Sequence, residues 1–152
     1  MYATVNYVNK DRSIGSINVM DLANHRETVK IKWNRPSEIF LSPKVVEDLI
    51  DHLNKLESFA EFCELHERDG YAFVSIDVND RLKHYSLVYE YEIGKCDDDY
   101  YWEITVKMKD LVEVLKLLDN RIFFHAEYHR PLVVYDYVNL FFIAGKEEGA
   151  TF

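Results

Sequence analysis

The sequence predicts a single-domain α+β fold, with about seven to eight strands in a mainly antiparallel sheet and two amphipathic helices. Three observations predict this class. A chain of 152 residues is long enough to bury the core of one domain. Short runs of alternating apolar and polar residues recur along it, separated by turn-forming residues. Two segments place apolar residues at helical spacing, and strand-turn-strand units with few helices favour antiparallel pairing.

The first elements are expected to be strands. Residues 2–8 and 13–20 are short apolar segments, and the polar residues 9–12 between them are typical of a turn. Residues 27–33 alternate regularly, so that their apolar side chains share one face of the predicted strand.

A helix is predicted next. Ser42 is a favourable N-cap, and Pro43 suits the first helical position. From there apolar residues recur at three- and four-residue spacing as far as Cys63, which is typical of an amphipathic helix. Asp69-Gly70 is expected to end the helix or to follow it as a turn, so that His66, Glu67 and Arg68 would lie at its end.

The second half returns to strands. Residues 71–78, 83–93 and 100–107 alternate between apolar and polar side chains. A shorter amphipathic helix is expected over residues 108–120. Residues 121–143 are predicted to form a final hairpin that turns at the sequence His-Arg-Pro.

The predicted order of elements raises the question of an internal repeat. Residues 1–66 and 71–119 both read as three strands followed by a helix, so the domain could be a loose duplication of a βββα unit. Two amphipathic helices that each pack one apolar face on the core would also resemble each other by chance. We therefore expect one domain over residues 1–152 and leave its origin open.

The charge of the chain constrains its partners. The formal net charge is −9, and residues 1–41 carry six Lys or Arg and four Asp or Glu, whereas the remainder carries twelve and twenty-three. An acidic surface repels phosphate, so direct nucleic-acid binding is disfavoured. The N-terminus lacks a basic start before an apolar run, and no apolar stretch could span a membrane, which predicts a soluble, cytoplasmic protein. Cys63 and Cys96 lack metal-site spacing.

Residues 89–105 hold an unusual density of acid, namely six carboxylates and five aromatic rings with a single lysine. We expect residues 85–93 to pair with residues 100–107, with Ile93 opposite Tyr100. In this register Glu90 faces Glu103, and like charges directly across a strand pair are destabilising.

Because stability alone would not choose this arrangement, we interpret the acidic face as a surface for a basic partner. Tyrosines among carboxylates fit this hypothesis, since tyrosine contributes buried area and the acids steer association. The alternative is a solvated face that keeps the chain soluble and blocks edge pairing. The candidate partner-binding residues are Glu90, Glu92, Asp97, Asp98, Asp99, Tyr101 and Glu103.

A second cluster offers an enzymatic alternative. His125, Glu127 and His129 share a face of the predicted last hairpin, and Asp136 is expected opposite His125. Two imidazoles and two carboxylates could hold a divalent metal with a position left for water, as in a metal-dependent hydrolase or nuclease. His129 could instead be a turn residue, with His125 simply paired to Asp136.

These observations favour a non-catalytic, acidic binding or inhibitor protein with no cofactor. An immunity protein, or an antagonist of a nucleic-acid-handling defence enzyme, would have this charge layout. The sequence contains no Gly-rich phosphate loop and no nucleophile elbow. The enzymatic alternative and homo-oligomerisation both stay open.

Overall fold

The computed structural model describes residues 4–8, 14–18, 34–80, 85–118, 121–136, 139–143 and 145. The predicted α+β class is confirmed. The described residues form ten strands and two helices: β1 (Thr4–Val8), β2 (Ile14–Asn18), β3 (Ser37–Leu41), α1 (Pro43–Leu56), β4 (Phe62–Arg68), β5 (Tyr71–Asp80), β6 (Tyr85–Lys95), β7 (Glu103–Lys107), α2 (Met108–Leu117), β8 (Ile122–Ala126), β9 (Leu132–Tyr135) and β10 (Asn139–Ile143). The predicted strand over residues 27–33 lies outside the described residues.

The described strands are divided between two sheets. One has six strands in the order β2-β1-β10-β9-β8-β3, and the other has four in the order β6-β5-β4-β7. Among the described strands every pairing is antiparallel except that of β1 with β10, so the prediction of mainly antiparallel pairing is confirmed. The first and last strands thus lie side by side within the six-stranded sheet.

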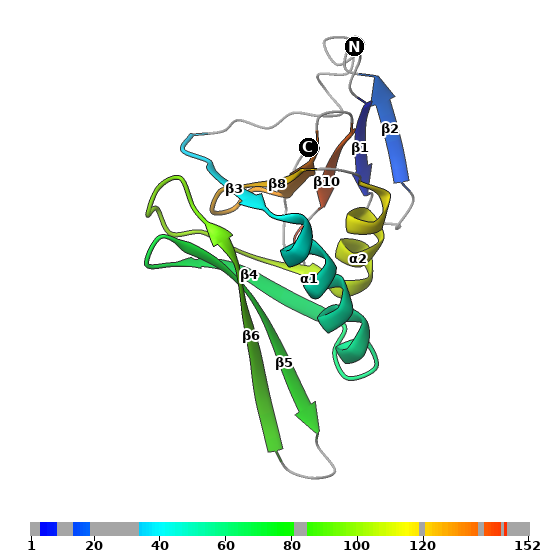
Figure 1. The fold of residues 1–152 in the computed structure, drawn as a ribbon, viewed down its shortest axis with the longest axis vertical. Coiled ribbons are helices and arrows are strands. Elements are labelled where there is room, and N and C mark those ends of the chain that lie inside the picture. The colour runs from blue at the N-terminus through cyan, green and yellow to red at the C-terminus, as the bar shows by residue number, and fades with distance from the viewer. Residues whose placement is uncertain are drawn as a thin grey trace.

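Both helices cover the core with one face, as their apolar spacing predicts. In α1 the Ser42 hydroxyl accepts a hydrogen bond from the Val45 amide at 3.3 Å, and Pro43 occupies the first turn. Figure 1 shows α1 and α2 side by side. Their buried residues join one hydrophobic core with both sheets: Val46, Leu49 and Leu53 from α1, and Met108, Leu111, Val114 and Leu115 from α2. Neither helix of the described chain is long and apolar enough to cross a membrane.

The first helix is shorter than predicted, because α1 ends at Leu56 and residues 62–68 form β4. Cys63 and Leu65 are buried whereas the residues between them are not, which is the period of a strand. Asp69 and Gly70 have φ angles of 55° and 83°, as a tight hairpin turn requires, and they join β4 to β5. The prediction that residues 66–69 end a helix was therefore wrong.

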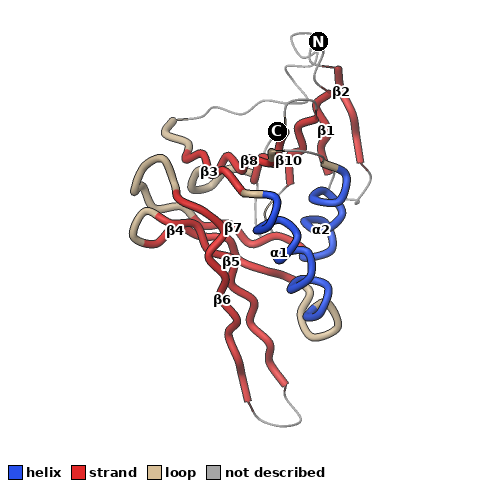
Figure 2. Tube along the Cα trace, in the orientation of Figure 1, coloured by secondary structure: helices blue, strands red, loops and turns tan. Residues whose placement is uncertain are grey.

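The two sheets meet at β3 and the end of β6, where Ile39 and Cys96 form an isolated bridge. Gly94 allows this approach, since a Cβ atom there would lie 2.7 Å from the carbonyl oxygen of Phe40. Beyond this junction β5 and β6 run together away from the rest of the molecule, toward the bottom of the view in Figures 1 and 2.

Candidate partner-binding surface

The predicted pairing of residues 85–93 with 100–107 was wrong. In the four-stranded sheet β6 pairs with β5, and β7 pairs with β4 at the opposite edge. The β4–β5 hairpin lies between them, and it was absent from the sequence-based prediction because β4 was assigned to the helix. Glu90 therefore lies opposite Ser75, and Glu103 lies opposite His66.

Strand alternation nevertheless places Glu90, Glu92 and Glu103 on the same side of this sheet. The register aligns Glu92 with Phe73, Phe73 with His66, and His66 with Glu103. Glu92 and Glu103 are thus three strand spacings apart, or about 14 Å. The outer sheet face is defined here as the side of the four-stranded sheet that bears Glu64, His66, Phe73, Ser75, Glu90, Glu92 and Glu103.

Glu90 is held in place rather than repelled by a like charge. The Arg68 guanidinium donates to it and also lies 4.2 Å over the ring of Phe73. The second carboxylate oxygen of Glu90 accepts a hydrogen bond from the Ser75 hydroxyl at 3.4 Å. The hydrogen bond and charge of Arg68 hold the pKa of Glu90 below its usual value, so Glu90 is a stable negative charge on the outer sheet face.

His66 lies between two acids of the outer sheet face, and its buried Nδ1 has no hydrogen-bond partner among the described residues. Its Nδ1 lies 3.5 Å from Glu64 Oε1, and its Nε2 lies 3.9 Å from Glu90 Oε2. The imidazole stacks on Phe73 with ring centroids 5.8 Å apart. The Phe73 ring therefore lies among His66, Arg68 and the acids of this face.

The three aspartates lie in the connection between β6 and β7, and they differ in role. One oxygen of Asp97 accepts from the Ser37 hydroxyl and the Glu38 amide, at 3.1 and 2.9 Å. Asp98 accepts from the Tyr100 amide at 3.0 Å. These two carboxylates order the connection, although Asp97 is exposed like Asp99.

Asp98 also connects this segment to Arg35. The second Asp98 oxygen lies 3.5 Å from Arg35 Nε, and the guanidinium lies 3.5 Å over the ring of Tyr100. Residues 34–36, 97–102 and 127–131 together are called the three-loop cluster here. It encloses a hollow of about 320 Å³ lined by aromatic and charged side chains.

Tyr101 joins the three-loop cluster to the outer sheet face. Its hydroxyl donates to Glu103, and this hydrogen bond raises the pKa of Tyr101 to about 12, with burial and the charges of Glu103 and Glu64 adding to the shift. The Tyr101 ring lies 5.8 Å from that of Tyr128. Tyr100, Tyr101 and Tyr128 are 50%, 54% and 44% exposed, so three large rings face solvent together.

Sequence reasoning missed Arg35, Tyr100 and Tyr128 as members of this surface. The sequence predicts Tyr100 within a strand, opposite Ile93, whereas β7 begins only at Glu103. The available signal was composition, since Tyr and Arg in turn segments are typical of binding surfaces. It did not indicate that three segments distant in the sequence come together.

The residues of the predicted metal site, His125, Glu127, His129 and Asp136, lie on β8, in the turn after it and just after β9. Val133, and not Asp136, lies opposite His125, so that part of the prediction was wrong. Asp136 is buried just after β9 and accepts a hydrogen bond from the amide of Asn139, the first residue of β10, at 2.6 Å. The final segment therefore folds into three strands rather than one hairpin.

Glu127 and His129 lie in the turn after β8. Glu127 accepts from the amides of Asn34 and Arg35, and its other oxygen lies 3.5 Å from Arg130 Nε. His129 has a φ angle of 64° and its ring lies 3.8 Å from that of Tyr128. Among the described residues, no group of three or more His, Cys, Asp or Glu side chains is arranged to hold a metal ion.

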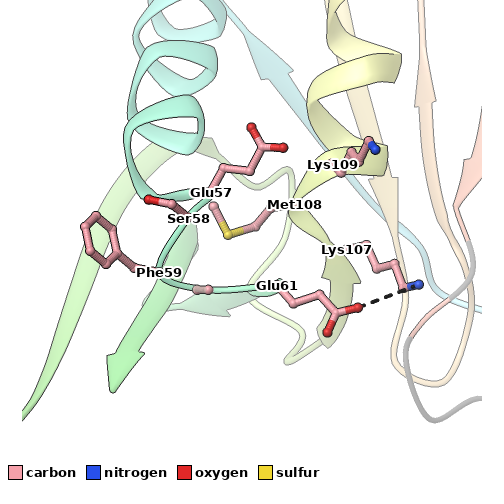
Figure 3. A pocket seen from close by; sticks show the side chains of 8 residues that line it. Glu57, Ser58, Phe59, Glu61, Lys107, Met108 and Lys109 are labelled. Atoms are coloured by element: carbon pink, nitrogen blue, oxygen red, sulfur yellow. Dashed lines mark ion pairs between the residues drawn. The ribbon is translucent and has the colours of Figure 1, made fainter. Parts of the chain in front are cut away.

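A second hollow, of about 430 Å³, lies between the turn after α1 and the start of α2. Figure 3 shows its lining, in which Lys107 Nζ lies 3.8 Å from Glu61 Oε1. Glu57 and Glu61 balance Lys107 and Lys109, so this hollow has no evident charge preference.

Comparison with known proteins gives no relative for this chain: no family model, curated protein or solved structure matches it.

Proposed function

We propose that this chain is a non-catalytic cytoplasmic protein that binds a basic protein partner through the three-loop cluster and the outer sheet face. The observation that carries the proposal is the position of Tyr100 and Tyr101, each about half exposed, beside Asp98, Asp99 and Glu103. Exposed tyrosines provide contact area at a low cost in side-chain entropy, which is typical of binding surfaces.

The charge distribution favours a basic partner. The outward side chains of the four-stranded sheet include more acids than bases, namely Glu64, Asp77, Glu90, Glu92 and Glu103 against Arg68, Lys95 and Lys107. The chain as a whole has a net charge of −9. Charge of one sign attracts an oppositely charged protein from a distance and increases its association rate.

The aromatic rings could also receive cationic side chains. Arg35 already stacks on Tyr100, which gives an example within the chain of the contact that a partner's lysine or arginine would make with Tyr101 or Tyr128. The combination of rings and carboxylates supports recognition of a basic surface rather than of phosphate. An immunity protein against a basic toxin, or an antagonist of a nucleic-acid-handling defence enzyme, would have these properties.

An affinity capture experiment with matched charge reversals tests the proposal. The wild-type chain is immobilised, and bound proteins are eluted with a salt gradient and identified. We expect a basic protein that elutes as salt screens the contact. In Asp99→Lys/Glu103→Lys its affinity should fall at least about tenfold, because like charges then face each other across the interface.

The control variant is Glu47→Lys/Glu113→Lys, which makes the same change in net charge at exposed positions on α1 and α2. It should retain the partner at close to wild-type affinity. Equal loss in both variants would reduce the effect to net charge alone, and unchanged binding in Asp99→Lys/Glu103→Lys would refute the proposed surface.

A further inference from the structure

The edge strand β6 exposes three large apolar side chains in succession. It forms the outer edge of the four-stranded sheet, and Leu87, Val88 and Tyr89 are 48%, 64% and 38% exposed. Successive residues of a strand point to opposite faces, so exposure of all three means that β6 is open on both faces here. Figure 2 shows this part of β5 and β6 extending beyond the two helices.

Edge strands with an open row of amide and carbonyl groups readily pair with another strand. Proteins usually prevent this with lysine, proline, a short strand or a bulge at the edge. Residues 85–92 have the sequence YSLVYEYE, without lysine or proline, and β6 is eleven residues long. The irregularity in its pairing with β5 lies at Ala72 and Phe73, opposite the other end of β6.

That other end is already covered. Cys96 bridges to Ile39 of β3, and Gly94 lies against the backbone of Phe40. His52 of α1 stacks on Tyr91 at 4.0 Å, which supports the inner face of β6 near its middle. The anchored end and middle fix the strand, while no described strand pairs with the outer edge of residues 85–90.

We propose that the edge of β6 receives an added strand from the basic partner, a segment in which lysine or arginine alternates with apolar residues. This inference rests on the proposed function, and it specifies how the partner would bind. Glu92 is exposed on the outer sheet face, where it would meet a basic side chain, whereas Glu90 beside it is already paired with Arg68. Leu87 and Tyr89 lie on the other face, where they would meet the apolar ones.

Charge favours a basic strand from a partner over a strand from a second copy of the chain. Glu92 is exposed, and its charge would pair with a basic strand. Two copies of a chain with a net charge of −9 instead repel each other. Main-chain hydrogen bonds would supply affinity and the alternating side chains would supply specificity, as in other cases of strand addition.

A synthetic peptide of alternating lysine and valine serves as the probe, with fluorescence anisotropy as the measurement. The matched control peptide has the same sequence with N-methyl groups on alternate backbone amides. It keeps the charges and side chains but loses donors of the strand ladder. We expect the first peptide to bind and the methylated peptide to bind at least about tenfold more weakly.

The protein variants locate the contact. Val88→Lys puts a positive charge on the open edge, where it faces Asp77 of β5 and should leave the hairpin intact. It should weaken peptide binding at least about tenfold. Phe59→Lys is the matched control, because Phe59 is 63% exposed but lies in the turn after α1. It should bind the peptide as the wild type does.

The outcomes separate this inference from the proposed function. Equal binding of both peptides, or binding that is lost in Asp99→Lys/Glu103→Lys but kept in Val88→Lys, would overturn strand addition at β6 and leave the basic partner in place. If the chain forms a concentration-dependent dimer that Val88→Lys abolishes, the strand added at β6 comes from a second copy of the chain, and the proposed partner strand is wrong. Absence of peptide binding would also overturn the inference, whereas the capture experiment would still test the proposed function.

Discussion

Individual acidic residues of the predicted site turn out to have different roles. Glu90 is tied to Arg68, and Asp97 and Asp98 order the chain between β6 and β7. Asp99 and Glu92 are exposed, as Glu90 and Asp97 also are, so it is the contacts with Arg68 and Ser37 that distinguish the latter two. The sequence predicted that these acids lie on or beside one sheet, but their individual roles depend on Arg68, Ser37 and Arg35, which lie on other segments.

The pH dependence of stability should depend on His125. Burial lowers the pKa of His125 below its ordinary value, although the charges of Glu38, Asp97 and Glu127 oppose the shift. Unfolded histidine binds a proton near pH 6.5, whereas the folded form resists it. The unfolded state therefore binds more protons in this window, so the free energy of unfolding decreases as the pH falls through about 6.5 toward the lowered pKa.

Urea denaturation at pH values on both sides of this window checks the prediction. His125→Gln should reduce the loss of stability between neutral and mildly acidic pH. An unchanged pH dependence in this variant would mean that other groups cause the loss.

At the scale of elements, the start of α1 was predictable and its end was not. Ser42 and Pro43 indicated the first turn, and both act as expected. Cys63 fits both the helical spacing of the preceding residues and the alternation of β4, so the apolar pattern alone could not separate them. The Asp-Gly pair was the better signal, because it favours a hairpin turn.

The cap of α1 gives a stability prediction. Ser42→Ala removes the hydroxyl that accepts from the Val45 amide, and should lower the free energy of unfolding by about 1 kcal/mol. Ser58→Ala makes the same change at an exposed position after the helix and should have a smaller effect. Equal effects in chemical denaturation would contradict this role for Ser42.

The junction between β3 and β6 gives a second stability prediction. Gly94→Ala would place a methyl group 2.7 Å from the Phe40 carbonyl oxygen and 2.8 Å from the Ile39 side chain. We expect a loss of about 1–3 kcal/mol, because the backbone of β3 would have to shift. Thermal unfolding of this variant measures the effect, and wild-type stability would show that the two sheets separate easily at this point.

At the scale of the whole molecule, the fold class and the kinds of secondary-structure element could be predicted from the sequence, but the order of the strands in the sheets could not. Alternation and helical spacing indicated an antiparallel α+β fold. The prediction then paired neighbouring strands, whereas β6 and β7 occupy opposite edges of their sheet. Once β4 was missed, no local pattern could show that a hairpin separates them. The three-loop cluster could not be predicted from the sequence either, since Arg35, Tyr100 and Tyr128 come together only through the contact between the two sheets.

The corrected topology changes what the acidic surface can do. An acidic hairpin would present a narrow strip, whereas the observed sheet carries its charges from Glu92 to Glu103, over about 14 Å. Such a breadth suits a protein partner that is contacted by side chains from several strands.

Hydrogen exchange of the chain with and without its captured partner tests the central claim most directly. We predict slower exchange at residues 97–103 and along β6 in the complex, with α1 and α2 unchanged. Protection confined to α1, α2 or the turn at residues 57–61 would contradict a partner-binding role for the three-loop cluster and the outer sheet face.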